Sequence, residues 1–142
     1  MRLIHYGVDR FNPNLFKPIR NRNWVKPTGG LWTSPVQSKY GWVDFCKQEE
    51  FIVNSLELSF IIEIDDSRVY KIDNLNDLVR VATIPNSYNS NMLIDYEQLA
   101  TEYDAIWLTY DGQFNTRFGR PNLYGWDVET VLILNKECII NQ

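Results

Sequence analysis

Two features of the sequence predict a single α+β domain, built on a β-sheet with a few short helices. Residues 56–64 alternate apolar and polar side chains, which is the period expected of a half-buried strand. Residues 105–110 and 128–134 are apolar on both faces, as is typical of strands in the centre of a sheet. No linker or internal repeat divides the 142 residues, so one domain is expected over residues 1–142.

Turn and capping residues predict the elements near the start of the chain. Residues 2–6 are expected to form the first strand, and residues 9–28, which contain three prolines, an irregular loop. Residues 31–34 form a short predicted strand that Pro35 ends. Ser38 is the expected N-cap of a helix with an aromatic face that carries Tyr40, Trp42, Phe45 and Cys46.

Two further short helices are predicted from their capping residues. Residues 69–72 form an apolar run, after which Asn74 is expected to cap a brief helix through Leu75, Leu78 and Val79. Asp95 is expected to cap another, which carries Tyr96, Leu99 and Tyr103. Residues 84–91 are predicted to be a loop.

Residues 111–126 are also predicted to be a loop, rich in glycine and aromatic side chains. A loop of this length in a compact domain is typically functional or mobile. It is interpreted either as a surface loop held by Phe118 and Tyr124 or as a binding surface.

The composition excludes several classes of protein. Hydrophobic residues make up 44% and aromatic residues 14% of the chain, too many for a disordered protein. No apolar run approaches the roughly 20 residues that span a bilayer. Arg2 is followed by only two apolar residues, so no signal peptide is expected, and a cytoplasmic protein is favoured.

The charge pattern argues against a general nucleic-acid surface, because the net charge is −4. Two local basic clusters fit either solvated loops or contacts with phosphates. Their members are Lys17, Arg20, Arg22 and Lys26 in the first and Arg117 and Arg120 in the second. Cys46 and Cys138 lack metal-ligand spacing and are expected to be buried free thiols, so no metal site is expected.

The run from Lys26 to Cys46 is predicted to form the floor of a binding pocket. Gly29 and Gly30 allow backbone angles that other residues avoid, so that chain or ligand can approach closely. A strand leading into an aromatic helix presents a flat apolar wall with polar edges.

Two carboxylates lie at the start of the last strong strand. A period of two places Asp127 and Glu129 on the same face as Val131 and Ile133. A buried carboxylate is costly unless it has a partner or a role. The pair is therefore either an acidic strand end at the surface or part of a functional site.

Three segments together resemble the ADP-ribosyltransferase fold, in the branch that contains diphtheria toxin and the poly(ADP-ribose) polymerases. Gly30, Leu31 and Trp32, followed by Ser38, Lys39 and then Tyr40 or Trp42, resemble the second motif of that branch. In that motif a Gly, an aliphatic residue and a Tyr precede a Ser-Lys-Ser-like segment and another aromatic residue. Trp32 stands where the branch has Tyr, which keeps the ring face and loses the hydroxyl.

The other two motifs lie near the two ends of the chain. Glu129 followed by TVLIL resembles the third motif, a catalytic Glu at the start of an apolar strand. His5 and Gly7 in LIHYG resemble the first motif, a His followed by Gly, although Tyr6 intervenes here. That insertion departs from the pattern at the backbone contacts to the nicotinamide amide.

The resemblance also implies an acceptor-binding region. Asp127 lies two residues before the Glu, where some bacterial toxin relatives carry a Gln or Glu that helps choose the acceptor. The preceding loop corresponds to the acceptor-recognition loop of the family. Acceptor binding is therefore expected of Phe118, Arg120, Tyr124 and Asp127.

The resemblance implies a compact split β-sheet core and an enzyme that transfers ADP-ribose from NAD to a protein or nucleic-acid acceptor, releasing nicotinamide. Its catalytic residues would be Glu129, His5 and Trp32, and its NAD-binding residues His5, Gly7, Gly30, Trp32, Ser38, Tyr40 and Trp42. Cleavage of the nicotinamide bond builds positive charge on the ribose, which a carboxylate stabilises. Nicotinamide leaves as a neutral molecule, so no metal is required.

The resemblance also suggests partners and leaves alternatives. Arg20, Arg22 or Lys26 are candidates to pair with the pyrophosphate. Relatives of this compact type occur in bacterial or phage conflict systems, where an inhibitor or antitoxin is an expected partner. The alternatives are an NAD glycohydrolase, a noncatalytic nucleotide- or protein-binding module on the same fold, and an interaction protein with an aromatic patch around Trp42, Phe114 and Phe118.

Overall fold

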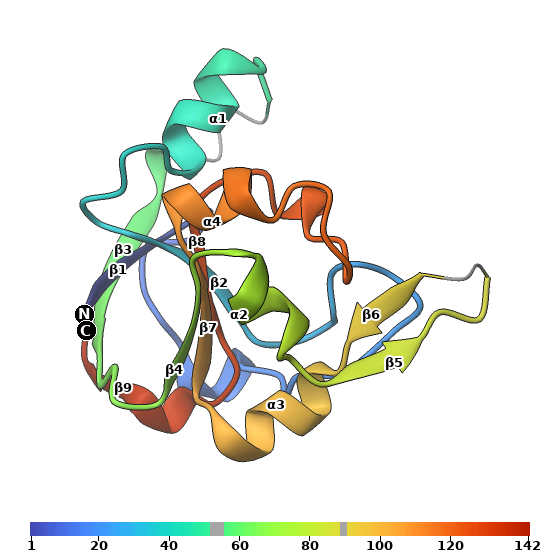
Figure 1. The fold of residues 1–142 in the computed structure, drawn as a ribbon. Coiled ribbons are helices and arrows are strands. Elements are labelled where there is room, and N and C mark those ends of the chain that lie inside the picture. Colours follow the sequence, from blue (N-terminus) through green and yellow to red (C-terminus); the bar gives the residue numbers. More distant parts are fainter. Residues whose placement is uncertain (52–55, 89–90) are drawn as a thin grey trace.

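The chain folds into the mixed α+β architecture that the sequence predicts, in a computed structural model that describes residues 1–51, 56–88 and 91–142. Over these residues one sheet has seven strands in the order β4, β7, β8, β2, β1, β3, β9 (Figure 1). Neighbours are antiparallel except β4 and β7, which are parallel. The strands are β1 (Arg2–Tyr6), β2 (Leu31–Pro35), β3 (Ser59–Ile64), β4 (Val69–Ile72), β7 (Ala105–Leu108), β8 (Thr130–Ile133) and β9 (Ile139–Asn141).

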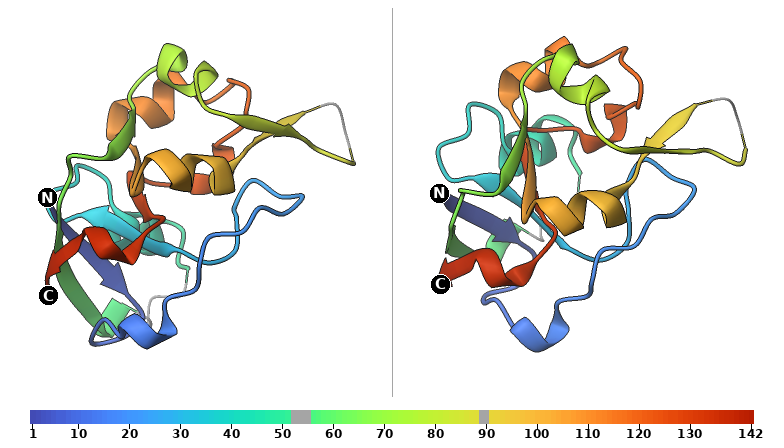
Figure 2. Two further views of the ribbon diagram at one scale, coloured as in Figure 1. Left: turned by 90° about the horizontal axis from the view of Figure 1, so that it is seen from below. Right: turned by 60° about the horizontal axis from the view of Figure 1, so that its bottom comes forward.

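Short helices and a two-stranded hairpin complete the described fold. The hairpin, β5 (Thr83–Pro85) and β6 (Met92–Ile94), projects from the body of the molecule (Figure 2). Asn74 and Asp95 cap helices as predicted, because their side chains accept from the backbone N–H of Asp77 and Gln98. The helices are α1 (Trp42–Gln48), α2 (Leu75–Val79), α3 (Tyr96–Glu102), α4 (Tyr110–Asn115) and the 3₁₀ turns η1 (Pro13–Leu15), η3 (Tyr124–Trp126) and η4 (Lys136–Cys138).

Helix α1 begins later than predicted. Gly41 is its N-cap, and the Asp44 carboxylate accepts from the Gly41 N–H at 2.9 Å. Tyr40 therefore lies outside the helix, and Ser38 is not its cap. The Ser38 hydroxyl instead donates a hydrogen bond to the Glu129 carboxylate. The two residues are 91 positions apart in the sequence, so a local pattern cannot reveal this contact.

The segment predicted as a loop after residue 110 contains two helical turns. The strand β7 ends at Leu108, and the Thr109 hydroxyl oxygen then accepts from the Gly112 N–H at 2.9 Å to start α4. Tyr110 is thus helical rather than extended. The 3₁₀ turn η3 closes the same segment.

Two other boundaries differ from the sequence prediction. Residues 56–58 precede β3, so the alternating strand is shorter than its pattern. Residues 83–85, partly predicted as loop, pair with residues 92–94 as β5 and β6. The last residues of that predicted loop before Asn91, 89 and 90, lie outside the described part of the chain.

The sheet separates two hydrophobic clusters. The helix-covered core lies between one face of β7 and β8 and the helices, and includes Ile72, Leu78, Leu99, Ile106 and Leu132. The sheet-enclosed core joins side chains of β1 and β3 to those of β7 and β8, and includes Leu3, Phe60, Ile62, Val131 and Ile133. Because strands from both ends of the sheet share this second cluster, the sheet must curve around it.

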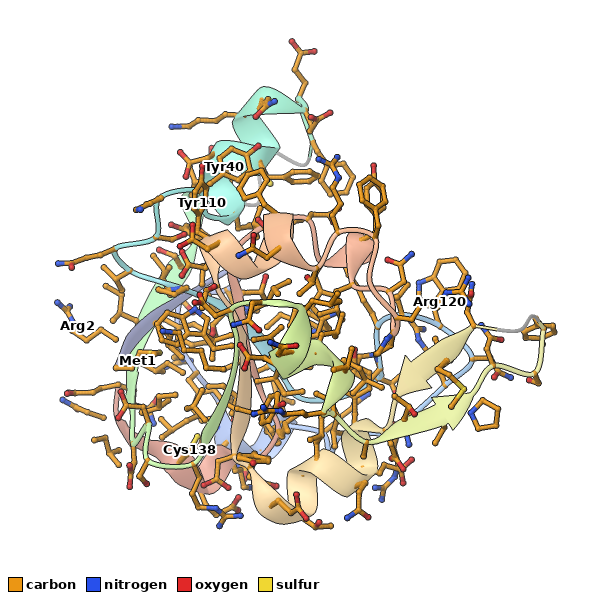
Figure 3. The ribbon with its side chains drawn as sticks, viewed as in Figure 1. Met1, Arg2, Tyr40, Tyr110, Arg120 and Cys138 are labelled. Carbon is orange, nitrogen blue, oxygen red and sulfur yellow. The ribbon has the colours of Figure 1, made fainter. Side chains whose placement is uncertain are left out.

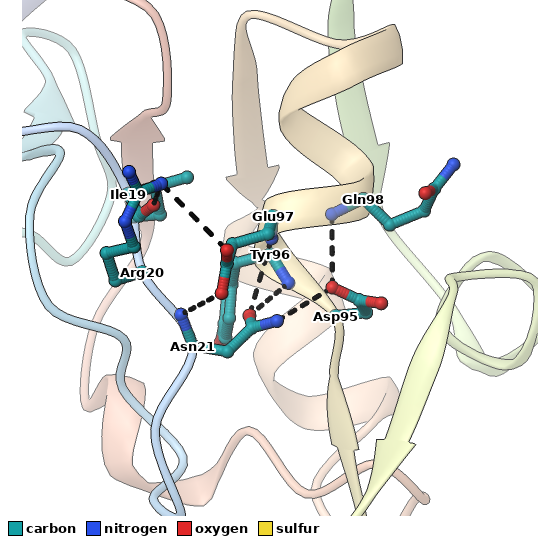
Figure 4. A network of polar contacts seen from close by, with 7 residues as sticks. All are labelled: Ile19, Arg20, Asn21, Asp95, Tyr96, Glu97 and Gln98. Atoms are coloured by element: carbon teal, nitrogen blue, oxygen red, sulfur yellow. Dashed lines mark hydrogen bonds and ion pairs between the residues drawn. The ribbon is translucent and has the colours of Figure 1, made fainter.

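The irregular loop of residues 9–28 is tied down by Asn21 (Figure 4). Its side-chain oxygen accepts from the Tyr96 N–H at 2.8 Å, and its amide nitrogen donates to Asp95 at 2.8 Å. The Tyr96 hydroxyl donates to the Val25 carbonyl at 2.8 Å. The start of α3 therefore fixes the path of the loop just before Lys26.

Candidate functional site

His5 lies where β1 and β2 separate. The two strands pair at Leu3 with Pro35 and at Ile4 with Ser34. Beyond that point the ladder is replaced by a side-chain contact, in which Nδ1 of His5 lies 2.7 Å from the Trp32 carbonyl oxygen. A carbonyl oxygen only accepts, so Nδ1 carries the proton. This bond ties the first motif directly to the second.

A cleft of about 390 Å³ opens beside this contact, and we call it the Trp32 cleft. Three tryptophans form its aromatic walls, and Trp32 meets Trp126 edge to face with ring centroids 5.0 Å apart. Tyr6 also lines this cleft. Its burial, and to a smaller extent the nearby Asp44 carboxylate, raises the pKa of its hydroxyl above the usual value. The residues that line the cleft include His5, Tyr6, Lys26, Trp32, Trp42 and Trp126.

Lys26 supplies the cationic group of the Trp32 cleft. Its ammonium nitrogen lies 5.5 Å from the centre of the Trp32 ring. The same nitrogen lies 3.7 Å from a carboxylate oxygen of Asp127. An aromatic wall with an adjacent cation suits a flat ligand that carries negative charge.

Glu129 is buried at the entry to β8, and both of its carboxylate oxygens are bonded. The Ser38 hydroxyl donates to Oε2 at 2.6 Å, and Nε1 of Trp107 donates to Oε1 at 3.1 Å. The residue is only 7% exposed. A buried carboxylate requires such partners, and two donors fix its orientation.

The Glu129 carboxylate and the Trp32 ring lie on opposite faces of the sheet. Trp107, which holds Glu129, packs against the sheet-enclosed core, whereas Trp32 packs against the helix-covered core. Gly41 lies close both to a residue that holds Glu129 and to a residue that lines the cleft. A Cβ atom on Gly41 would lie 3.6 Å from Cβ of Ser38, which holds Glu129, and 3.9 Å from Cβ of Ser34, which lines the cleft.

Asp127 and Glu129 do not form the predicted pair on one strand face. β8 begins at Thr130, and Asp127 precedes it with a φ of +58°, which an extended strand does not allow. Asp127 contacts Lys26, while Glu129 contacts Ser38 and Trp107. The period-two prediction was wrong here because the chain turns at Asp127 before it becomes extended.

A second cleft, of about 270 Å³, lies between α1, α4 and η3, and we call it the α4 cleft. Arg117 stacks over Tyr124 at 5.6 Å, and the Tyr40 hydroxyl donates to Gln48 at 2.6 Å. Figure 3 shows Tyr40 at the α1 end of the molecule. The residues that line the α4 cleft include Tyr40, Glu49, Phe114, Arg117, Tyr124 and Asp127.

The other residues expected to bind NAD lie away from the walls of the Trp32 cleft. The N–H of Gly7 donates to the Leu58 carbonyl at 2.9 Å, in a backbone with φ +112°. Gly30, at φ +69°, is required for packing, because a Cβ atom there would lie 2.7 Å from the Ile133 carbonyl oxygen. Ser38 is occupied by Glu129, and Tyr40 lines the α4 cleft.

The expected acceptor-binding residues divide between the α4 cleft and the open surface. Tyr124 and Asp127 line the α4 cleft. Phe118 is 95% exposed. Figure 3 shows Arg120, which precedes a cis proline, on the side of the molecule that carries the β5–β6 hairpin.

Sequence reasoning missed two tryptophans of the site. Trp107 was assigned only to a strand apolar on both faces, yet its ring nitrogen holds Glu129. Trp126 was assigned to a loop, yet it forms a wall of the Trp32 cleft. For Trp107 the indole N–H was the available signal, because a tryptophan in a central strand needs a polar partner. Trp126 gave no such signal, since its buried ring nitrogen has no hydrogen-bond partner in the described chain.

Within residues 1–51, 56–88 and 91–142 no group of three or more metal-ligating side chains occurs, and no helix is long and apolar enough to cross a membrane. Comparison with known proteins found no matching family model, no matching curated protein and no matching solved structure. The function must therefore be argued from the site itself.

Proposed function

We propose that this protein is an NAD-dependent ADP-ribosyltransferase that releases nicotinamide and modifies a protein or nucleic-acid acceptor. The observation that carries the proposal is the hydrogen bond from Ser38 to Glu129, 2.6 Å long. It joins the middle of the second motif to the glutamate of the third. The bond from His5 to the Trp32 carbonyl joins the first motif to the second in the same way.

The topology supports the same proposal. The strands that carry His5 and Trp32 and the strand that follows Glu129 are consecutive in the sheet, as β1, β2 and β8. Residues 5, 32 and 129, far apart in sequence, thus come from neighbouring strands. The curved sheet is consistent with the split core that the resemblance implies.

In this mechanism the Trp32 cleft holds the nicotinamide between aromatic faces supplied by Trp32 and Trp42. Nδ1 of His5 is committed to the backbone, which leaves Nε2 as an acceptor for a ribose hydroxyl. Glu129 does not line the Trp32 cleft, so in this mechanism the ribose extends from the cleft past Ser34 towards Ser38, where the Glu129 carboxylate stabilises the positive charge that develops on it. The donors on Glu129 keep that carboxylate oriented before the ligand arrives.

A noncatalytic nucleotide-binding module is the second candidate, and one observation favours it. Both oxygens of Glu129 already have protein donors, and the carboxylate faces away from the Trp32 ring. In that function Glu129 only ties the 36–41 segment to β8, and the cleft binds its ligand without reaction. An NAD glycohydrolase is the variant in which water replaces the acceptor.

Mass spectrometry of NAD incubated with the protein and a cell lysate tests these candidates by following nicotinamide release and ADP-ribose adducts. We expect Glu129→Gln, which keeps the side-chain shape, to lower nicotinamide release by about 100- to 1000-fold. Glu137→Gln, an exposed acid in η4, is the matched control and should match the wild type.

Each outcome selects one candidate. Release with an adduct supports the transferase and names its acceptor, and release without an adduct supports the glycohydrolase. If the wild type binds NAD in calorimetry but releases no nicotinamide, the transferase proposal is wrong and the binding module replaces it. A cytoplasmic site of action, in a bacterial or phage conflict system with an inhibitor or antitoxin, is part of the same proposal.

A further inference from the structure

The structure separates Lys26 from the other basic residues of the first loop. Arg20 pairs with Glu97 on α3, at 3.9 Å. Arg22 turns back on its own loop, where Nε donates to the Lys26 carbonyl at 2.6 Å. Of these three cations, Lys26 alone lines the Trp32 cleft.

The ammonium group of Lys26 is shared between the cleft and a carboxylate. It lies over the Trp32 ring on one side and 3.7 Å from Asp127 on the other. The two side chains of this ion pair are 35% and 33% exposed. A pair this exposed is weak, so another anion can displace the Asp127 carboxylate.

Hydrogen bonds fix the backbone around Lys26, whereas its side chain has only a partly exposed ion pair and a ring contact. The carbonyl groups of Val25 and Lys26 accept hydrogen bonds from Tyr96 and Arg22. The loop before them is anchored to α3 through Asn21 (Figure 4). A lysine side chain on a fixed backbone can reorient within the cleft without moving the loop.

Asp127 stands at the boundary of two clefts. It pairs with Lys26 of the Trp32 cleft, and it lines the α4 cleft. Its φ of +58° is a conformation that non-glycine residues rarely adopt and that costs about 1–3 kcal/mol where it occurs. A backbone conformation of this kind persists where the surrounding contacts hold it in place. The ion pair with Lys26 is one of the contacts that hold Asp127.

We propose that Lys26 is the phosphate-binding residue of the Trp32 cleft, and that a ligand phosphate replaces the Asp127 carboxylate as the partner of its ammonium group. The ligand class is a flat base with an attached sugar phosphate. Binding in the Trp32 cleft then leaves an unpaired carboxylate at the edge of the α4 cleft, which couples the two clefts. This inference deepens the proposed function, on which it rests, by assigning the phosphate contact and its competitor.

Calorimetry with two matched ligands tests the phosphate contact. Nicotinamide mononucleotide and nicotinamide riboside share base and ribose and differ only by the phosphate. We expect the wild type to bind the mononucleotide about tenfold more tightly. Lys26→Met should abolish that preference, and Lys26→Arg, which keeps the charge, should retain it.

Asp127→Asn tests the competition. Removing the carboxylate frees Lys26, so binding of the mononucleotide should tighten by about threefold, with no change for the riboside. The same substitution in the Lys26→Met background should change neither affinity. Lys39→Met is the control, because Lys39 lies at the same 5.5 Å from an aromatic ring, that of Tyr110, yet does not line the Trp32 cleft.

Three results would overturn the inference: a wild type that does not discriminate between the ligands or binds neither, a Lys26→Met variant that still discriminates, or an Asp127→Asn variant that does not tighten binding of the mononucleotide. Failure of the proposed function looks different, because an inactive protein can still discriminate between the two ligands through Lys26. Thermal unfolding of each variant checks that its fold is intact.

Discussion

The charged groups on the two faces of β8 differ in how deeply they are buried and in how firmly their partners are held. On the face of the sheet-enclosed core, Glu129 is 7% exposed and both carboxylate oxygens have donors. On the face of the Trp32 cleft, Lys26 and Asp127 pair at 3.7 Å with about a third of each side chain exposed. Burial makes partners obligatory for the first group, whereas water can replace the partner of the second.

The comparison indicates which part of the site is fixed and which can exchange. A carboxylate held by two buried donors is oriented before any ligand binds, as electrostatic catalysis requires. An exposed ion pair beside aromatic walls can give up its partner to a ligand at little cost. Glu129 belongs to the fixed part of the site, and Lys26 belongs to the part that can exchange its partner.

The largest expected effect tests whether the two faces of β8 belong to independent cores. Leu132 is fully buried and lies opposite Trp32, so Leu132→Ala should lower the free energy of unfolding by about 3 kcal/mol. Val131→Ala, on the other face, should lower it by about 2 kcal/mol. Val131 and Leu132 are neighbours in the chain, so coupling between them would appear in urea denaturation of the double variant as a departure from the sum of the two losses. We expect the sum, because the two side chains pack in different clusters on opposite faces of the sheet. A loss well below the sum would mean that the cores respond as one.

High pH provides the next effect, because each core contains an acid that burial keeps protonated. Burial, followed by the nearby Asp104 carboxylate, raises the pKa of Cys138 to about 11, and burial also raises the pKa of Tyr96. Below pH 9 the full stabilisation is present. As the pH rises from 9 through 11 the unfolded chain loses the thiol proton first, and about 2–3 kcal/mol of stability should be lost from Cys138 alone.

Chemical unfolding at pH 8 and pH 10.5 measures this loss. Cys138→Ala, in the sheet-enclosed core, should make the free energy of unfolding depend less steeply on pH. Tyr96→Phe, in the helix-covered core, should have the same effect. The interpretation fails if the slope is the same in both variants as in the wild type.

The smallest effect compares the same substitution on the two faces. Trp107→Phe removes the indole donor to Glu129, whereas no hydrogen bond of the Trp32 ring nitrogen occurs in the described chain. Trp107→Phe should therefore cost about 1–2 kcal/mol more in unfolding free energy than Trp32→Phe. Equal losses would show that the bond to Glu129 contributes nothing net.

Elements that depend on neighbouring residues were predicted correctly from the sequence. Asn74 and Asp95 cap α2 and α3 because a cap acts within one helical turn. The alternation in residues 59–64 and the apolar run in residues 130–133 mark β3 and β8, because burial of one or both faces repeats at fixed spacing. The α+β class followed from these local patterns.

The sequence by itself determined six of the described strands (β1, β2, β3, β4, β7 and β8), two of the helix caps and the motif residues His5, Trp32 and Glu129. Only the tertiary structure decided which of them meet, because the bonds from Ser38 and Trp107 to Glu129 join positions 91 and 22 residues apart. It also placed Trp32 and Glu129 on opposite faces and paired Asp127 with Lys26. Local spacing fixes the direction of a side chain within one element, whereas its partners depend on how the sheet curves and where the loops return.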